Sequence, residues 1–245
     1  MVKRVVATLI SVAISLTMLF SLNRCESVAE MCRCRKDLAG EGEYVISQYD
    51  DIMKIVGVES GIDWRLLSAI AHTESNFRAD AVSKRGATGL MQIMPHIGEH
   101  FGMTVEDLAI PQNNIRAAAA LLEEIGEMIK VPDGVPFEDA MSLILASYNG
   151  GLGHVADARR LARAHGDDMN SWADVSRYLA LKSNPEFYEH EVVSYGKFTG
   201  SRQTIAYVSN VMRRYRRYCA IAEPATLATM LCELGCPIHS LDNLL

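Results

Sequence analysis

The chain has little of what marks several common classes of protein. Its 245 residues contain no internal repeat and no low-complexity linker, and strand signals are scarce. Basic residues are not in excess, because 24 Lys and Arg stand against 30 Asp and Glu and the net charge is −6. We therefore expect no binding to nucleic acid. Hydrophobic residues make up 49% and charged residues 22%, which excludes a mainly disordered, collagen-like or polytopic membrane protein.

Cysteine is absent from the middle of the chain. The six cysteines lie near the two ends, at positions 25, 32, 34, 219, 232 and 236. Cysteines that bracket a domain in this way are typical of disulfides that tie tails to a body in an oxidising compartment. A metal site is the weaker interpretation, because histidines at ligand spacing are missing. We expect neither a metal nor a cofactor.

The first 24 residues have the composition of an export signal. Lys3 and Arg4 precede an apolar run over residues 5–22, which is the build of a secretory signal peptide or of an uncleaved membrane anchor. Cys25 follows directly and resembles the acylated cysteine of bacterial lipoproteins, although Arg24 stands where a small residue is usual. We expect an exported, monomeric protein of the periplasm, attached to the outer membrane through a lipid on Cys25 or through the anchor.

The rest of the sequence predicts a mainly helical protein. We expect a lead-in and first helix over residues 25–58, a single domain over 59–220 and a cysteine-containing tail over 221–245. Residues 78–93 lack a helical period and predict a loop with a short hairpin. The helix signals are apolar residues at helical spacing over 44–56, an N-cap at Asp63, Pro111 before a helix ending at Ile129, a helix over 137–147 before Gly150, one over 152–165, a Ser171 cap, and a last helix over 201–220.

Glu74 stands at the end of the apolar helix that Asp63 begins. It lies four residues after Ile70 and seven after Leu67, so it shares their inward face. A carboxylate on a buried face is costly unless it is paired or functional. Burial also raises the pKa of a carboxyl group, which is what a general acid needs near neutrality. The alternative is a helix-end glutamate turned to solvent.

Two further segments carry residue types that suit a binding site. Residues 87–95 place Gly89 and the polar Gln92 within an apolar run, where the alternative is a short edge strand over the core. In the second, Tyr148 and Asn149 fall where a helix ends and glycines follow, which would bring a phenol and an amide to the wall of a cleft. A helix C-cap and turn is the alternative there.

Together and in this order, these segments resemble the soluble-lytic-transglycosylase (SLT) family of lytic transglycosylases. Members carry Glu-Ser, then Gly-Leu-Met-Gln-(Ile/Leu)-x-Pro, then Ala-Tyr-Asn-x-Gly, and here the counterparts begin at Glu74, Gly89 and Ala146. Tyr207 to Val211 resemble the closing Tyr-Val-x-Asn-(Ile/Val) helix. The likeness covers residues 59–218, and within it the stretch over residues 187–198 looks most like the membrane-bound members of the MltF type. It implies a mainly α, α+β lysozyme-like catalytic domain with a small irregular or β-hairpin segment.

The resemblance implies an enzyme that cleaves the MurNAc–GlcNAc strands of peptidoglycan. Glu74 would protonate the glycosidic oxygen and then take the proton of the MurNAc C6 hydroxyl, which closes on C1 to leave a 1,6-anhydro end. No second acid occurs in the matching segments, as two-carboxylate hydrolysis needs. The resemblance also assigns substrate-binding residues, namely Ser75, Ser83, Gln92, Met94, Tyr148 and Asn149, with the Tyr148 hydroxyl close to Glu74.

Two departures from the family pattern stand out. Ser147 is interposed in the Ala-Tyr-Asn segment, and Gln203 stands where many members have a glutamate that contacts the peptide stem. The second departure puts stem recognition in doubt and leaves the cleavage chemistry intact. The alternatives are a goose-type lysozyme-like hydrolase and a non-catalytic peptidoglycan-binding protein.

Overall fold

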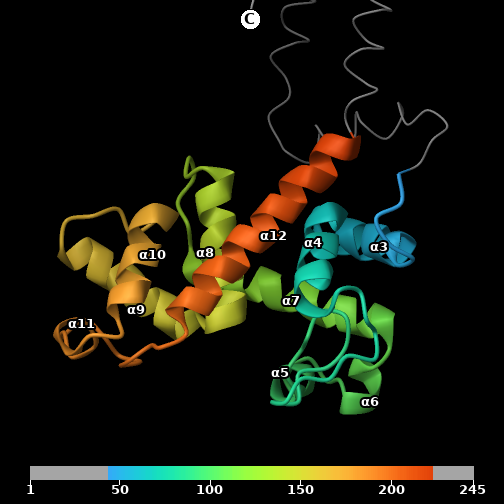
Figure 1. The fold of residues 1–245 in the computed structure, drawn as a ribbon, viewed down its shortest axis with the longest axis horizontal. Coiled ribbons are helices and arrows are strands. Elements are labelled where there is room, and N and C mark those ends of the chain that lie inside the picture. The colour runs from blue at the N-terminus through green and yellow to red at the C-terminus, as the bar shows by residue number, and fades with distance from the viewer. Residues whose placement is uncertain (1–43, 223–245) are drawn as a thin grey trace, which may run out of the picture. The chain divides into compact units, whose positions relative to one another are not determined.

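A computed structural model describes residues 44–222 of the chain. These residues form mainly helices, joined by short loops (Figure 1). In chain order the helices are α3 (Asp50–Ser60), α4 (Trp64–Ser75), α5 (Pro95–His100), α6 (Val105–Leu108), α7 (Pro111–Ile129), α8 (Phe137–Gly150), α9 (Leu152–Ala164), α10 (Trp172–Leu181), α11 (Pro185–Tyr188) and α12 (Ser201–Ala222). The expected mainly helical fold is confirmed.

Most helix boundaries lie where the sequence signals predict them. The side chain of Asp63 accepts a hydrogen bond from the backbone N–H of Arg65 and caps α4, which satisfies one of the free donors at a helix start. Pro111 occupies the first turn of α7, where the missing N–H costs nothing. Gly151, at φ +94°, separates α8 from α9, so a residue type tolerant of positive φ stands at the break.

The first described helix begins later than its apolar spacing predicts. That spacing starts at residue 44, whereas α3 begins at Asp50. The Asp50 carboxylate accepts hydrogen bonds from the backbone N–H groups of Ile46 and Ser47, at 2.7 and 3.0 Å. These bonds hold residues 46–49 in a non-helical turn, so the helix begins only at Asp50. The three short helices α5, α6 and α11 carry too few residues to show a period, and they were not predicted, although α5 and α11 begin with a proline and α6 has a capping box.

Residues 78–93 form the predicted loop with a small hairpin. Antiparallel bridges join Val82 to Thr88 and Thr88 to Ile93. Residues 89–92 make the tight turn between the bridged Thr88 and Ile93, whose backbone groups exchange hydrogen bonds of 2.9 and 3.1 Å. The turn includes Gly89 and Gln92, both with positive φ. Gln92 therefore lies in a turn, and the edge-strand alternative is wrong.

Helix α12 crosses both α4 and α8 and holds them together (Figure 1). On the other sides α4 packs against α3, and α9 packs against α8 and α10. The buried side chains of these helices form one continuous hydrophobic cluster, to which α12 contributes Tyr207, Val208 and Val211. Burial of apolar surface of this kind is the main favourable term in folding. The ends of α4 and α8 are thereby fixed against the same helix.

Several predictions fall outside the described residues. They concern the signal or anchor over 1–24, the lipid on Cys25, the cysteines other than Cys219, and most of the tail over 221–245. Within residues 44–222, no helix is both long and apolar enough to cross a membrane.

Candidate active site

Glu74 is half-buried on the last turn of α4, as its inward position predicted. Burial raises the pKa of its carboxyl group from 4.5 to about 7, and the adjacent hydroxyl of Tyr207 opposes part of that rise. The C-terminal end of a helix also disfavours a negative charge. No charged side chain among the described residues contributes to the shift. Glu74 can therefore exist in both protonation states near neutral pH.

The chain turns sharply directly after Glu74. Asn76 caps α4 in the left-handed region at φ 54°, and Phe77 follows at φ 60°. Consecutive non-glycine residues in this region are uncommon and cost about 1–2 kcal/mol each. Ser75 compensates on the inside of the turn: its buried hydroxyl lies 2.9 Å from the carbonyl of Leu90 and accepts from the backbone N–H of Arg78. This residue thus links the end of α4 to the 89–92 turn.

Two tyrosine hydroxyls from other helices are buried beside Glu74. Burial, followed by the charge of Glu74, raises the pKa of Tyr148 on α8 and of Tyr207 on α12 well above 10, so both are protonated phenols at neutral pH. The Tyr148 hydroxyl donates to the carbonyl of Met91 at 2.7 Å. The Tyr207 hydroxyl has no partner at full hydrogen-bond geometry among the described residues. It is the free donor next to the carboxyl group.

The side chain of Asn114 on α7 binds the backbone of the turn over residues 89–92. This side chain is fully buried: its oxygen accepts from Met91 N at 2.8 Å, and its amide donates to the carbonyls of Thr88 and Leu108 at 2.9 Å. A Cβ at Gly89 would stand 2.6 Å from Asn114, so only glycine allows this approach. Ser75, Tyr148 and Asn114 thus attach the same turn to three different helices.

The other predicted site residues lie around this turn and at the end of α8. Gln92 donates from its side-chain amide to the carbonyls of Ala81 and Gly89, at 3.1 and 3.0 Å. Asn149 accepts from the hydroxyl of Thr204 at 2.9 Å. The remaining positions are Ser83, whose hydroxyl accepts from Ala87 N at 2.9 Å, and Met94, which precedes α5.

The structure brings some of these residues together and keeps others apart. Glu74 and Tyr148 act on each other electrostatically, and Ser75 and Tyr148 hold the turn that Gln92 ends. Among the described residues, no hydrogen bond joins Glu74 directly to Ser83, Gln92 or Asn149.

Tyr207 and Asn114 were not predicted as site residues. A tyrosine on the inward stripe of α12 could have drawn attention to Tyr207, because a buried hydroxyl needs a partner. Asn114 had no such signal beyond being polar within an apolar helix.

Residues 52–170 match the model of a family described as the transglycosylase SLT domain. The chain carries an SLT domain. It is 34% identical over 179 residues to the membrane-bound lytic murein transglycosylase F of Marinobacter nauticus, covering 73% of this chain and 34% of that protein. It is also 36% identical over 175 residues to the protein of the same name from Maricaulis maris, and that match covers 71% of this chain and 37% of that protein. The expected likeness to the MltF type is confirmed.

The chain spans about a third of the length of the curated relatives it matches. Among solved structures, it is similar to the 70 kDa soluble lytic transglycosylase SLT70 of Escherichia coli, with 25% identity and a TM-score of 0.46. That match covers 70% of this chain and 24% of that one. Glu74, the turn over 89–92 and Tyr148 all lie within the stretch that the family model covers.

Proposed function

We propose that this protein is a peptidoglycan lytic transglycosylase with Glu74 as its catalytic group. The observation that carries the proposal is a carboxyl group of pKa about 7, half-buried beside two phenols, inside an SLT domain. A group with this pKa can donate a proton in one step and accept one in the next. Its substrate would be the MurNAc-β-1,4-GlcNAc strand, in keeping with the murein named for the relatives.

The protonated Glu74 donates to the glycosidic oxygen as the bond to C1 breaks through an oxocarbenium-like state. The carboxylate so formed then takes the proton of the MurNAc C6 hydroxyl, and that oxygen bonds to C1. Proton and bond counts balance without water, and the product ends in 1,6-anhydro-MurNAc. The segments that match the family pattern contain no second acid, which supports this route because hydrolysis normally uses a second carboxylate.

The neighbouring residues divide into groups that contact substrate and groups that hold the site. Tyr207 donates to Glu74 when the carboxylate forms, since its hydroxyl is adjacent and otherwise unpartnered. Gln92, Met94, Ser83 and Asn149 bind the sugars. Ser75 has its hydroxyl committed to backbone groups, so we propose a positioning role for it in place of direct substrate contact.

Replacement of Glu74 tests the proposal. Glu74→Gln keeps the shape of the side chain and removes the transferable proton, so release of soluble fragments from purified peptidoglycan is expected to fall to background. Circular dichroism should show the wild-type helix content. Asp80→Asn is the matched control, because Asp80 is the nearest exposed acid along the chain and should leave activity unchanged. Full activity of Glu74→Gln would refute the assignment.

Export, lipid attachment at Cys25 and location at the outer membrane belong to the same proposal. The relatives are named as membrane-bound, and the first 25 residues resemble a lipoprotein signal except at Arg24. Incorporation of radiolabelled palmitate by the wild type, and its loss in Cys25→Ser, would support lipidation. Export without label would favour an uncleaved anchor.

A further inference from the structure

A hollow lies between the end of α7 and the start of α9, and Glu74 is not among its lining residues. Its volume is about 180 Å³, and its walls include Met128, Leu152, Gly153, Ala156, Arg160 and Tyr195. A single water needs about 10–15 Å³ measured in this way, so the hollow is large enough for a small organic group. None of the residues assigned above to the site around Glu74 lines it.

Tyr195 forms one wall of this hollow and presents an open ring face. A Cβ at Gly153 would lie 2.5–2.7 Å from three ring carbons of Tyr195, so the ring lies across Gly153 at a distance that only glycine permits. Yet 63% of the residue is exposed. One side of the ring therefore lies against the backbone of α9, and the ring also meets that of His154 edge-on with centroids 6.3 Å apart, while most of the residue remains exposed. Large exposed aromatic side chains that are held in place commonly serve as contact surfaces.

A buried ion pair fixes the backbone that carries Tyr195. The carboxylate of Asp157 accepts from the backbone N–H groups of Ser194 and Tyr195, each at 2.9 Å, and lies 2.5 Å from Nζ of Lys182. The side chains of Asp157 and Lys182 are both fully buried. A buried pair gives little net stability because both charges lose their hydration. What this pair does provide is a fixed position for residues 194–195.

Further contacts connect the same segment with the end of α8. The N–H of Phe198 donates to the carbonyl of Lys182 at 3.1 Å. The ring of Phe198 lies so close to Gly150 that a Cβ there would be 3.2 Å from it. Gly150 follows Asn149, a predicted sugar-binding residue. The segment 194–198 therefore runs from the hollow to the border of the proposed active site.

We propose that Tyr195 and the hollow beside it form a distal sugar subsite, which holds an N-acetylated sugar ring of the glycan strand remote from the bond that Glu74 cleaves. The inference rests on the proposed function. A pyranose ring has an apolar C–H face that stacks on an aromatic ring and a polar rim that suits the edge of a hollow. Because Asp157 and Lys182 hold the platform in place beforehand, little entropy is lost on binding.

The two arginines that line the hollow already have partners within the protein. Arg159 donates to the carbonyls of Ile129 and Met169 and to the side-chain oxygen of Asn170. Arg160 is engaged by Asp157 and by the carbonyl of Val192. Both guanidinium groups of the lining thus have protein partners. A neutral sugar can bind beside these groups without breaking their hydrogen bonds.

Binding to oligomers of N-acetylglucosamine tests the subsite. In the Glu74→Gln background, Tyr195→Ala is expected to weaken the hexamer about three- to tenfold, the size of a single aromatic contact, as measured by calorimetry. Tyr195→Phe should keep the affinity, because the ring remains. Phe137→Ala is the control for loss of an exposed aromatic elsewhere, since Phe137 is 50% exposed at the opposite end of α8 from Asn149. Unchanged hexamer binding by Tyr195→Ala would overturn the inference.

Cleavage assays separate this inference from the proposed function. With Glu74 intact, Tyr195→Ala should raise KM on stem-free glycan strands and leave kcat near the wild-type value. If only peptide-bearing strands show the defect, the occupant is the stem and the sugar assignment is wrong. If the wild type binds the hexamer through Tyr195 but cleaves no peptidoglycan, the proposed function fails and the subsite stands.

Discussion

At the residue scale, the chemistry depends on where one glutamate lies. Glu74 is on the inner face of α4, close enough to the surface to meet a substrate and buried enough to hold a proton at neutral pH. Burial contributes most to the shift, and Tyr207 limits it. A carboxyl group left fully in water would have a pKa near 4.3 and would be ionised too early to act as an acid.

The raised pKa predicts that Glu74→Gln stabilises the protein in alkaline solution. The carboxyl group of Glu74 has a pKa of about 7 in the folded protein, against 4.5 for the same group without a protein environment. Its contribution to stability is therefore fully present below pH 4.5 and is lost as the pH rises through 7. The loss approaches about 3 kcal/mol at pH 8. The urea midpoints of the wild type and of Glu74→Gln should coincide near pH 4, and at pH 8 the midpoint of Glu74→Gln should be the higher one. A difference independent of pH would contradict the assigned shift.

Activity should fall as the carboxyl group of Glu74 ionises. Because the first step needs the protonated acid, kcat/KM is expected to fall about tenfold per pH unit above pH 7. The measurement is the initial rate of fragment release at low substrate concentration between pH 5 and 9. Tyr207→Phe removes the donor that favours the carboxylate, so the falling limb should shift to higher pH. An unshifted limb in that variant would show that Tyr207 does not act on Glu74.

At the element scale, the site depends on one turn being attached to three helices. Ser75 of α4, Asn114 of α7 and Tyr148 of α8 each bond a different backbone group within or beside residues 89–92. A tight turn has little internal stability, so its position comes from these outside partners. The side chain of Gln92, which we propose to bind sugar, is therefore oriented by residues far from it in sequence.

Removal of Asn114 is expected to loosen this turn. Asn114→Ala removes the side-chain partner of the Met91 N–H and of the Leu108 carbonyl, and each unsatisfied buried group costs about 1–3 kcal/mol. The Thr88 carbonyl loses one of its two hydrogen bonds and keeps the one from Ile93. Thermal unfolding should shift to lower temperature, and hydrogen exchange at the Met91 amide should speed up. Asn113→Ala, on the same helix and only half-buried, is the control and should change neither. Equal effects of the two substitutions would argue against a specific role for Asn114.

The sequence predicts the elements better than it predicts their mutual contacts. The boundaries at Asp63, Pro111 and Gly151 could be read because each depends on one residue's local conformation. The inward position of Glu74 followed from its spacing to Ile70. The approach of Tyr207 to Glu74 and the attachment of Asn114 to the turn could not be read, because they depend on how α12 and α7 cross other helices. Asp157 looked like an ordinary helix residue, yet it fixes the segment around Tyr195.

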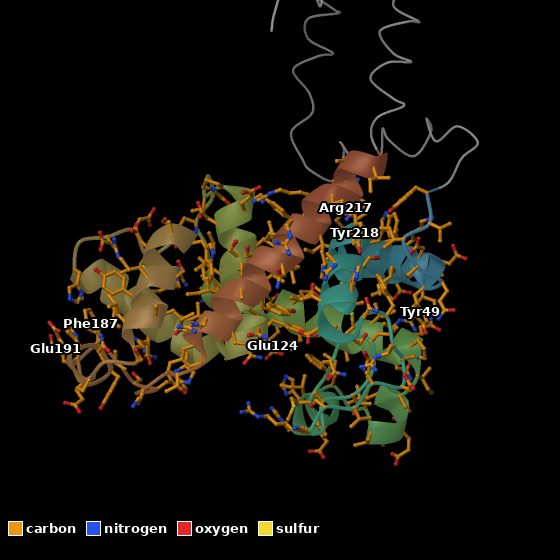
Figure 2. All side chains as sticks on the ribbon, in the orientation of Figure 1. Tyr49, Glu124, Phe187, Glu191, Arg217 and Tyr218 are labelled. Carbon is orange, nitrogen blue, oxygen red and sulfur yellow. The ribbon has the colours of Figure 1, made fainter. Side chains whose placement is uncertain are left out.

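At the scale of the whole molecule, α12 joins the helices that carry the site. Its inner face is part of the single hydrophobic cluster, and polar contacts reinforce both sides. The Tyr215 hydroxyl donates to Asp63 at the start of α4, and Arg216 pairs with Glu138 at the start of α8. Figure 2 shows Tyr218 near α4 at the far end of α12, where its hydroxyl lies 2.5 Å from Nδ1 of His72. The relative position of α4 and α8, and hence of Glu74 and Tyr148, follows from this helix.

A charge on the inner face of α12 should therefore unfold the described body as one unit. Val211 is fully buried, and Val211→Asp would place an unpaired carboxylate in the core at a cost of several kcal/mol. Far-ultraviolet dichroism and tryptophan fluorescence should report the same, lowered urea midpoint. Arg213→Asp, an exposed change on the same helix, should leave the midpoint close to the wild-type value. Two separate transitions in Val211→Asp would show that the helices on the two sides of α12 fold independently.

In the proposed mechanism, Glu74 alone performs both proton transfers and the sugar's own C6 hydroxyl is the nucleophile. The most direct test is mass spectrometry of the fragments released from purified peptidoglycan by the wild-type protein. We expect fragments ending in 1,6-anhydro-MurNAc, each lighter by one water than the hydrolysis product, and none of them in the Glu74→Gln digest. Reducing MurNAc ends in the wild-type digest would contradict this mechanism and would assign the protein to hydrolysis by an activated water.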